Sequence, residues 1–174
     1  MFDPETRNSP LVLETKKLIA EGFDQRSTDD LARLLAHADQ RVRQEAQFSL
    51  AAKGAAGTKT FAGVLSGSHQ IGRLHAIWGL GQIARTSPAA IGALLSMFGD
   101  ADAEVRSQAA KALGDVRSEK AYDGLVKLLS DSEPRPRFFA AISLSKLGRK
   151  ECVPAVLEML RANNDKDQIG RAHV

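Results

Sequence analysis

A short residue pattern recurs four times along this chain of 174 residues, and it limits the possible folds more than any other feature. In each copy an arginine is followed by an alanine three residues later and by a leucine seven residues later. Offsets +3 and +7 from the arginine lie on one face of an α-helix. A helix with one apolar stripe cannot bury that stripe alone, so the copies must share a continuous core. The four copies begin at Arg43, Arg73, Arg106 and Arg137, at spacings of 30, 33 and 31 residues.

Shorter apolar stripes lie between the four copies and predict a second set of helices. Each stripe has apolar residues at positions i, i+3 and i+4, and each ends at residues that break helices. No segment alternates apolar and polar residues as a strand does. We therefore expect an all-α chain, folded as a right-handed α-solenoid of about four to five antiparallel helix pairs. The stripes are Leu31–Leu35, Phe61–Leu65, Ile91–Phe98, Leu125–Leu129 and Val153–Leu160.

Two of the copies resemble a known repeat. Asp102–Gly114 and Arg137–Gly148 are similar to HEAT-like repeats, the short type that is also found in phycobilin lyases. The resemblance covers about residues 27–162, and it implies a solenoid of the ARM/HEAT type. It implies no particular activity, because arrays of this kind serve many functions.

Three segments resemble a narrower group of proteins. Arg43–Leu50, Arg73–Gln82 and Arg137–Ala141 are similar to the HEAT segment of large bacterial secreted proteins that join a quinoprotein-type dehydrogenase to a c-type cytochrome. This resemblance implies a spacer module in an electron-transfer protein and a periplasmic or secreted location. None of the matching positions is catalytic, and the chain has no Cys-x-x-Cys-His haem site.

The repeats divide the chain into three parts. We expect residues 1–26 to form an N-terminal cap helix or a linker, residues 27–162 the array, and residues 163–174 the truncated start of a further repeat. Residues 169–174 are also what a common sequencing-library adapter encodes, with a stop codon directly after the last residue. We expect these residues to be an artefact and the chain to be a fragment of a larger protein. The alternative is a genuine repeat, because residues 168–171 repeat residues 70–73.

No catalytic, metal or cofactor motif occurs in the sequence. The histidines have no metal-binding spacing, and Cys152, the only cysteine, has no histidine or acid at a motif distance. No phosphate-binding glycine loop and no nucleophile motif occurs either. The apolar runs are too short and too interrupted to span a bilayer. We therefore expect no catalysis, no cofactor, no metal, no small-molecule substrate and no membrane insertion.

The repeated arginines predict a structural ladder. In three copies an acidic residue lies four residues before the arginine, and opposite charges at i and i+4 on a helix attract each other. We expect these pairs to tie neighbouring repeats together. The alternative is that the arginines bind phosphate, because a guanidinium group fits phosphate oxygens well. The predicted ladder comprises Asp39, Arg43, Arg73, Asp102, Arg106, Glu133 and Arg137.

Variable residues beside the constant core indicate a candidate binding face. Offsets +2 and +9 from the arginine lie away from the core positions, and we place offset +5 at the margin of the same side. In a solenoid this side of the second helices lines the concave surface, where partners bind. The alternative for Trp78 is that it fills a gap in the core beside Gly72, Gly79 and Gly81. The candidate residues are Glu45, Phe48, His75, Trp78, Gln82, Gln108, Lys111 and Lys146.

These observations predict a non-catalytic scaffold for protein–protein or interdomain contacts. Aromatic anchors dominate the energetics of protein interfaces, so a tryptophan among polar residues suits protein recognition. The first alternative is the spacer module described above. A nucleic-acid-binding solenoid is a minor alternative, because the net charge is only +3 and the candidate face carries only two basic residues, Lys111 and Lys146.

Overall fold

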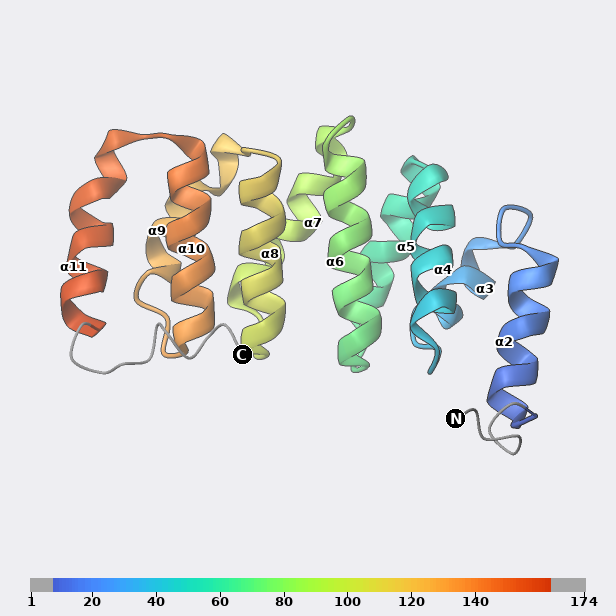
Figure 1. Ribbon diagram of the computed structural model, residues 1–174. Coiled ribbons are helices and arrows are strands. Elements are labelled where there is room, and N and C mark those ends of the chain that lie inside the picture. Colours follow the sequence, from blue (N-terminus) through green and yellow to red (C-terminus); the bar gives the residue numbers. More distant parts are fainter. Residues whose placement is uncertain (1–7, 164–174) are drawn as a thin grey trace. The chain divides into compact units, whose positions relative to one another are not determined.

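The computed structural model describes residues 8–163, and the chain divides into two compact units, residues 1–83 and residues 84–174. The described part of the chain contains ten α-helices, some short 3-10 turns and no strand (Figure 1). The predicted all-α solenoid of helix pairs is thereby confirmed. Within residues 8–163, no helix has the length and apolar character needed to cross a membrane.

In the first unit a lone helix precedes two helix pairs. The second helix of each pair carries the repeat arginine and is the longer one, with 13 and 15 residues against 7 and 11 for the first helices. Figure 1 shows α3 and α5 behind the second helices of this unit. The helices are α2 (Pro10–Glu21), α3 (Thr28–Leu34), α4 (Gln40–Ala52), α5 (Ala55–Leu65) and α6 (Gln70–Ala84), the last of which ends at the boundary of the units.

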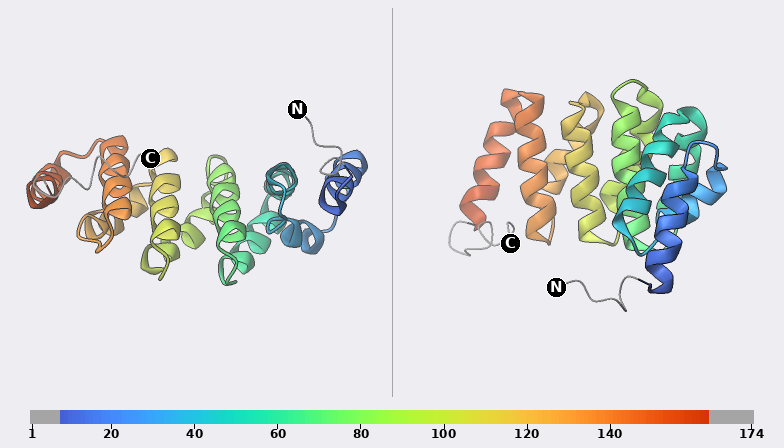
Figure 2. Two further views of the ribbon diagram at one scale, coloured as in Figure 1. Left: turned by 60° about the horizontal axis from the view of Figure 1, so that its bottom comes forward. Right: turned by 45° about the vertical axis from the view of Figure 1, so that its right-hand side comes forward.

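The second unit continues the alternation of first and second helices. Each of its first helices follows a single 3-10 turn. The two second helices, α8 and α10, pack side by side, as both views in Figure 2 show, and α9 packs against α10. The helices are α7 (Ile91–Ser96), α8 (Ala103–Asp115), α9 (Tyr122–Leu128), α10 (Pro134–Leu147) and α11 (Val153–Asn163).

Polar side chains begin several of these helices. The first turn of a helix leaves backbone N–H groups without partners inside the helix, and a Ser or Asp just before the helix accepts from them. Ser9 accepts from the N–H of Val12 at the start of α2, and Asp102 accepts from the N–H of Glu104 at 2.8 Å before α8. Asp39 has the same role before α4. In α4 and α8 the capping aspartate lies four residues before the repeat arginine, so the helix begins three residues before that arginine.

The predicted core positions are confirmed in both units. The alanine at +3 and the leucine at +7 are fully buried in all four second helices. The first helices add fully buried residues of their own, among them Leu31, Phe61 and Leu125. The core of each unit therefore lies between its first and second helices. The eight repeat positions are Ala46, Leu50, Ala76, Leu80, Ala109, Leu113, Ala140 and Leu144.

Small residues let neighbouring second helices approach closely. A methyl group added at Gly114 would lie 2.2 Å from Ser143 Oγ, and that hydroxyl donates to the carbonyl of Ala110 at 2.8 Å. The contact joins offsets +4 and +8 of α8 to offset +6 of α10. Helix α8 therefore turns its +4 and +8 flank toward α10, and α10 turns its +6 position toward α8.

Candidate functional site

The open side of the second helices is centred on offset +5. Each residue of a helix turns by about 100°, so offset +5 lies about 160° from both core offsets, +3 and +7. Phe48, Trp78 and Ile142 are 45%, 39% and 37% exposed, and Lys111 is exposed as well. Our placement of offset +5 at the margin was therefore wrong. The exposure of Trp78 also contradicts the alternative that its ring fills a gap in the core.

Offset +2 is buried in two copies, contrary to our expectation. His75 is 3% exposed and Gln108 is 8% exposed, whereas Glu45 is exposed. His75 is buried because α6 lies beside α4. Offset +2 of α6 faces α4, where His75 contacts Gln47. Gln108 donates its side-chain amide to Glu104 of its own helix at 2.8 Å. Neither residue belongs to the open side.

His75 is the centre of a buried polar network in the first unit. Arg43 Nε donates to His75 Nε2 at 3.1 Å, so His75 Nδ1 carries the proton and donates to Gln47 Oε1 at 2.8 Å. Burial and, after it, the charge of Arg43 lower the pKa of His75 to about 4, so the ring is neutral at pH 7. The rings of His75 and Trp78 pack edge to face, with their centroids 4.9 Å apart. The network therefore supports the exposed tryptophan from below.

Offset +9 places polar and charged residues beside the open side. Gln82 and Lys146 are half-buried. In the second unit Lys111 and Lys146 both donate to the carboxylate of Asp115, the +9 residue of α8. Burial alone would raise the pKa of Asp115, but the hydrogen bonds from the two lysines outweigh burial and hold that pKa below its ordinary value. One carboxylate thus balances part of the lysine charge on this side.

Three of the repeat arginines, Arg43, Arg106 and Arg137, contact the next repeat, but not through the predicted i, i+4 acids. In three copies Nη1 donates to the two backbone carbonyls that lie five and six residues earlier. Arg106 also makes two hydrogen bonds of 2.7 Å to the carboxylate of Asp131. Arg137 donates to Asn163 Oδ1 at 2.9 Å, and Arg73 donates to a carbonyl of α5 at 3.0 Å. These internal hydrogen bonds disfavour the phosphate-binding alternative.

The acids that we placed in the ladder lie at helix starts, so their predicted i, i+4 pairing is wrong. Asp39 pairs with Arg41 at 2.7 Å and not with Arg43, and Asp102 caps α8. Glu133 is the N-cap residue of α10, without a side-chain capping bond. An N-cap residue has an extended backbone, which directs its side chain toward the first N–H groups of the helix. The arginine one turn later then bonds to the loop carbonyls.

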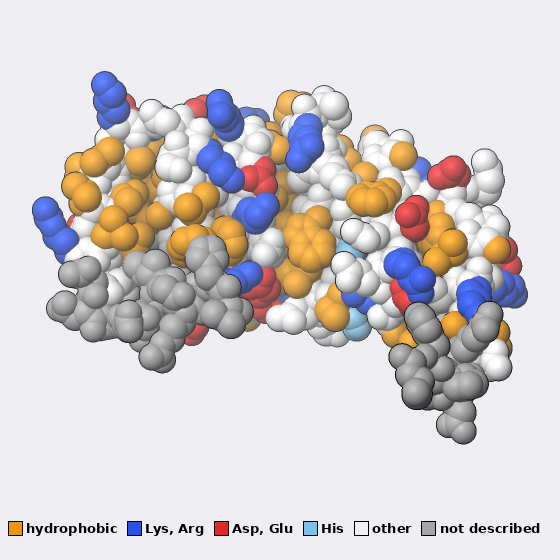
Figure 3. Space-filling view, viewed as in Figure 1, with side chains coloured by type: hydrophobic (Ala, Val, Ile, Leu, Met, Phe, Trp, Pro, Cys, Tyr) orange, Lys and Arg blue, Asp and Glu red, His pale blue; other side chains and the backbone are white. Residues whose placement is uncertain are grey.

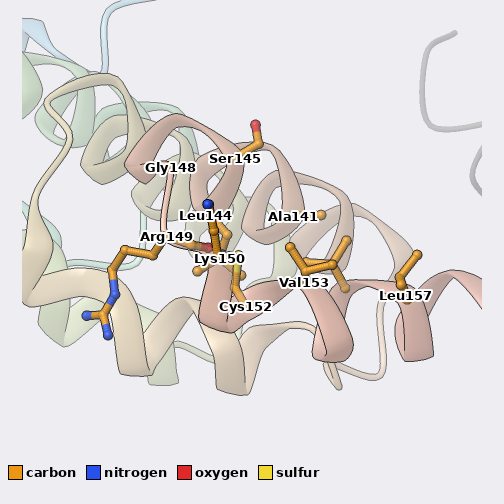
Figure 4. Close-up of a pocket in the computed structure, with 10 residues that line it drawn as sticks. Ala141, Leu144, Ser145, Gly148, Arg149, Lys150, Cys152, Val153 and Leu157 are labelled. Atoms are coloured by element: carbon orange, nitrogen blue, oxygen red, sulfur yellow. Dashed lines mark hydrogen bonds between the residues drawn. The ribbon is translucent and has the colours of Figure 1, made fainter.

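A feature that we did not predict is an apolar pocket of about 300 Å³ between α10 and α11 (Figure 4). Its apolar lining includes Leu144, Val153 and Leu157. Cys152 also lines the pocket; it is buried, and its thiol donates to the carbonyl of Arg149 at 2.9 Å. The only signal in the sequence was the apolar stripe of residues 153–160, from which we predicted a helix but no pocket.

Metal-binding chemistry has no visible support in residues 8–163. No group of three or more His, Cys, Asp or Glu side chains in this part of the chain is placed to hold a metal ion. His37 and His69 each accept a backbone N–H through Nδ1, from Asp39 and Gly72 respectively. Both rings therefore hold turns that lead into second helices.

Among solved structures, the chain is similar to the crystal structure of an engineered protein from the Northeast Structural Genomics Consortium. The TM-score is 0.50 and the sequence identity is 22%, over 97% of this chain and 83% of that chain. At this identity the likeness shows the fold alone. No curated protein matches the sequence, so the narrower resemblance to dehydrogenase–cytochrome proteins gains no support.

A family of repeats matches the sequence directly. The model of the family described as HEAT repeats matches residues 58–136 and again residues 93–173. The two matches together span more than half of the chain, and they include the repeats that begin at Arg73, Arg106 and Arg137. The helix pairs, the buried +3 and +7 positions and the arginines that link the repeats agree with this assignment. The chain belongs to the HEAT-repeat family.

Proposed function

We propose that this chain is a non-catalytic scaffold that binds a protein partner through Phe48 and Trp78, the exposed offset +5 residues of the second helices in its first unit. The observation that carries the proposal is the character of these two positions. Both are large aromatic residues, each more than a third exposed, at an offset that points directly away from the core. Aromatic residues are over-represented among the side chains that carry the binding energy of interfaces.

The support beneath Trp78 favours a binding role for this residue. Its ring packs edge to face against His75, which hydrogen bonds with Arg43 and Gln47 hold in place. A side chain that is already ordered loses less conformational entropy when a partner binds. Figure 3 shows apolar side chains on the outer surface of α4 and of α6, the helices that carry Phe48 and Trp78.

The charges in the second unit favour a protein partner over a nucleic acid. Binding to a phosphate backbone depends on several unpaired cations. Lys111 and Lys146 are both paired with the carboxylate of Asp115, and Arg106 is paired with the carboxylate of Asp131. The spacer role in an electron-transfer protein stays a prediction without a supporting contact.

Photo-crosslinking in cells that produce the chain tests the proposal. A photoreactive phenylalanine analogue at position 48 or 78 should give the same crosslinked protein. The analogue at Lys59 of α5 or at Lys127 of α9, both exposed on first helices, should not. Trp78→Ala should reduce crosslinking from position 48 by about tenfold or more.

The matched control is Leu13→Ala, which truncates a residue that is 52% exposed on α2 and should leave crosslinking unchanged. Circular dichroism checks that each variant keeps its helicity. Equal crosslinking from the first and second helices, or crosslinking that Trp78→Ala does not reduce, would contradict the proposal.

A further inference from the structure

Both ring nitrogens of His75 are engaged in hydrogen bonds. Arg43 Nε donates to His75 Nε2 at 3.1 Å, and His75 Nδ1 donates to Gln47 Oε1 at 2.8 Å. His75 and Gln47 are 3% and 4% exposed, so the ring and its acceptor are shielded from water. The ring therefore accepts a hydrogen bond from a cation, and it can do so only while Nε2 carries no proton.

The same contacts hold the surface on which the exposed tryptophan packs. His75 and Trp78 lie three residues apart on α6, and their rings meet edge to face. The imidazole ring cannot turn without losing one of its two hydrogen bonds. It therefore presents one fixed surface to Trp78, whose own ring is 39% exposed on the open side.

We propose that His75 is a positioning residue for Trp78, and that protonation of the His75 ring releases the partner that binds there. The inference rests on the proposed function and adds a mode of regulation to it. A proton on Nε2 would place two donors and two positive charges opposite each other at Arg43, so this contact must break. The ring then leaves its site between α4 and α6, and Trp78 loses the surface that orders it.

The charges around His75 favour this response. Arg43 is the charged group in direct contact with the ring, and burial together with its charge opposes protonation there. The single acid on α4, α5 and α6 is Glu45, which is exposed, and Asp39 at the start of α4 is paired with Arg41. The other charged side chains of these three helices are Arg41, Lys59 and Arg73. A protonated ring is therefore more stable in water than in this site.

Proton linkage gives the direction and the size of the effect. The pKa of His75 is lowered to about 4 in its site, and it returns toward its ordinary value of 6.5 once the ring is hydrated. Between these two values the released state binds more protons than the ordered state. The ratio of released to ordered chains should therefore increase by up to about tenfold for each pH unit below 6.5. Above pH 6.5 the binding of the partner should not depend on this group.

Fluorescence of the full chain tests the role of His75 without a partner. Trp78 is the only tryptophan, and acrylamide quenching measures how accessible its ring is. The quenching constant should increase about twofold or more between pH 7 and pH 4, at pH values where circular dichroism shows that helicity is kept. His75→Ala should give the higher quenching constant already at pH 7.

Two matched variants separate His75 from the other titrating groups. In His75→Gln the amide can accept from Arg43 and donate to Gln47, and it does not titrate, so the quenching constant should stay low at pH 4. Glu45→Gln removes the exposed acid at the same offset of α4. This variant should respond to pH as the unmodified chain does.

Crosslinking from position 48 tests the release itself. An extract of cells that produce the chain with the photoreactive analogue is adjusted to pH 7 or pH 4.5 and then illuminated. The crosslink seen at pH 7 should weaken about tenfold or more at pH 4.5. The His75→Gln chain should keep the crosslink at pH 4.5, because its support for Trp78 does not titrate. That result would also exclude an acid effect on the partner as the cause.

Three results would overturn the inference. They are a quenching constant that stays unchanged between pH 7 and pH 4, an equal increase in the His75→Gln chain, and a crosslink that the unmodified chain keeps at pH 4.5. Failure of the proposed function has a different signature. Position 48 then gives no specific crosslink at pH 7, which overturns the release as well, whereas the quenching of Trp78 still tests whether His75 positions this ring.

Discussion

Gly79→Ala is the substitution whose effect the geometry of the first unit specifies most directly. Gly79 lies inside α6 at offset +6, and a methyl group there would lie 2.2, 2.5 and 2.8 Å from three ring atoms of Phe61. Phe61 is fully buried on α5, so its ring has no open space to enter. The added methyl group must therefore push α5 and α6 apart or force the ring out of its preferred rotamer.

Two opposing contributions determine the magnitude. Replacing glycine by alanine inside a helix stabilises it by about 1 kcal/mol. Overpacking a filled core costs about 1–3 kcal/mol, and the distances to Phe61 place Gly79→Ala near the upper end of that range. We expect a net loss of about 2 kcal/mol in the free energy of unfolding of the first unit.

Urea unfolding followed by tryptophan fluorescence measures this loss, because Trp78 is the only tryptophan and lies in the first unit. The control is Gly63→Ala on the exposed side of α5, where an added methyl group meets nothing within 4 Å. That variant should gain about 0.5–1 kcal/mol from helix propensity alone. Phe61→Leu removes the three ring atoms in question, so Gly79→Ala should cost less in that background. If the Gly79→Ala variant had the same free energy of unfolding as the Gly63→Ala variant, this reasoning would be refuted.

Two further predictions concern the buried polar contacts. The pKa of His75 is lowered to about 4, so between about pH 6.5 and pH 4 the unfolded state binds more protons; the first unit should lose up to about 3 kcal/mol as the pH falls through this window. Urea titrations over this range check the slope, and a slope that His75→Gln leaves unchanged would assign it to other groups. Arg106→Lys should destabilise the second unit by about 1–3 kcal/mol, since lysine cannot reproduce the paired hydrogen bonds to Asp131. In thermal unfolding followed by circular dichroism, Arg41→Lys at the exposed pair should change stability by less than about 0.5 kcal/mol, and an equal effect of the two substitutions would contradict this assignment.

The repeat pattern was sufficient to predict the architecture. Alanine at +3 and leucine at +7 are spaced by one helical turn, and such a pair is buried wherever a partner helix covers it. Ala109 and Leu113 are fully buried for this reason, like their counterparts in the other three copies. The exposure of offset +5 was also accessible from the sequence, because the angle between positions on a helix follows from geometry alone; we misplaced it by treating the open side as centred on offsets +2 and +9.

The contacts on the flanks of the helices depended on the tertiary structure. Whether offset +2 is open or buried depends on the helix beside it, so Glu45 is exposed while His75 is buried against α4. The partner of Arg106 is likewise 25 residues away, at a position that only the stacking of repeats brings within 2.7 Å. Periodicity within one helix determines which side turns toward the core, and only the packing of neighbouring helices decides which flanking side chains meet, because those contacts join residues about one repeat apart.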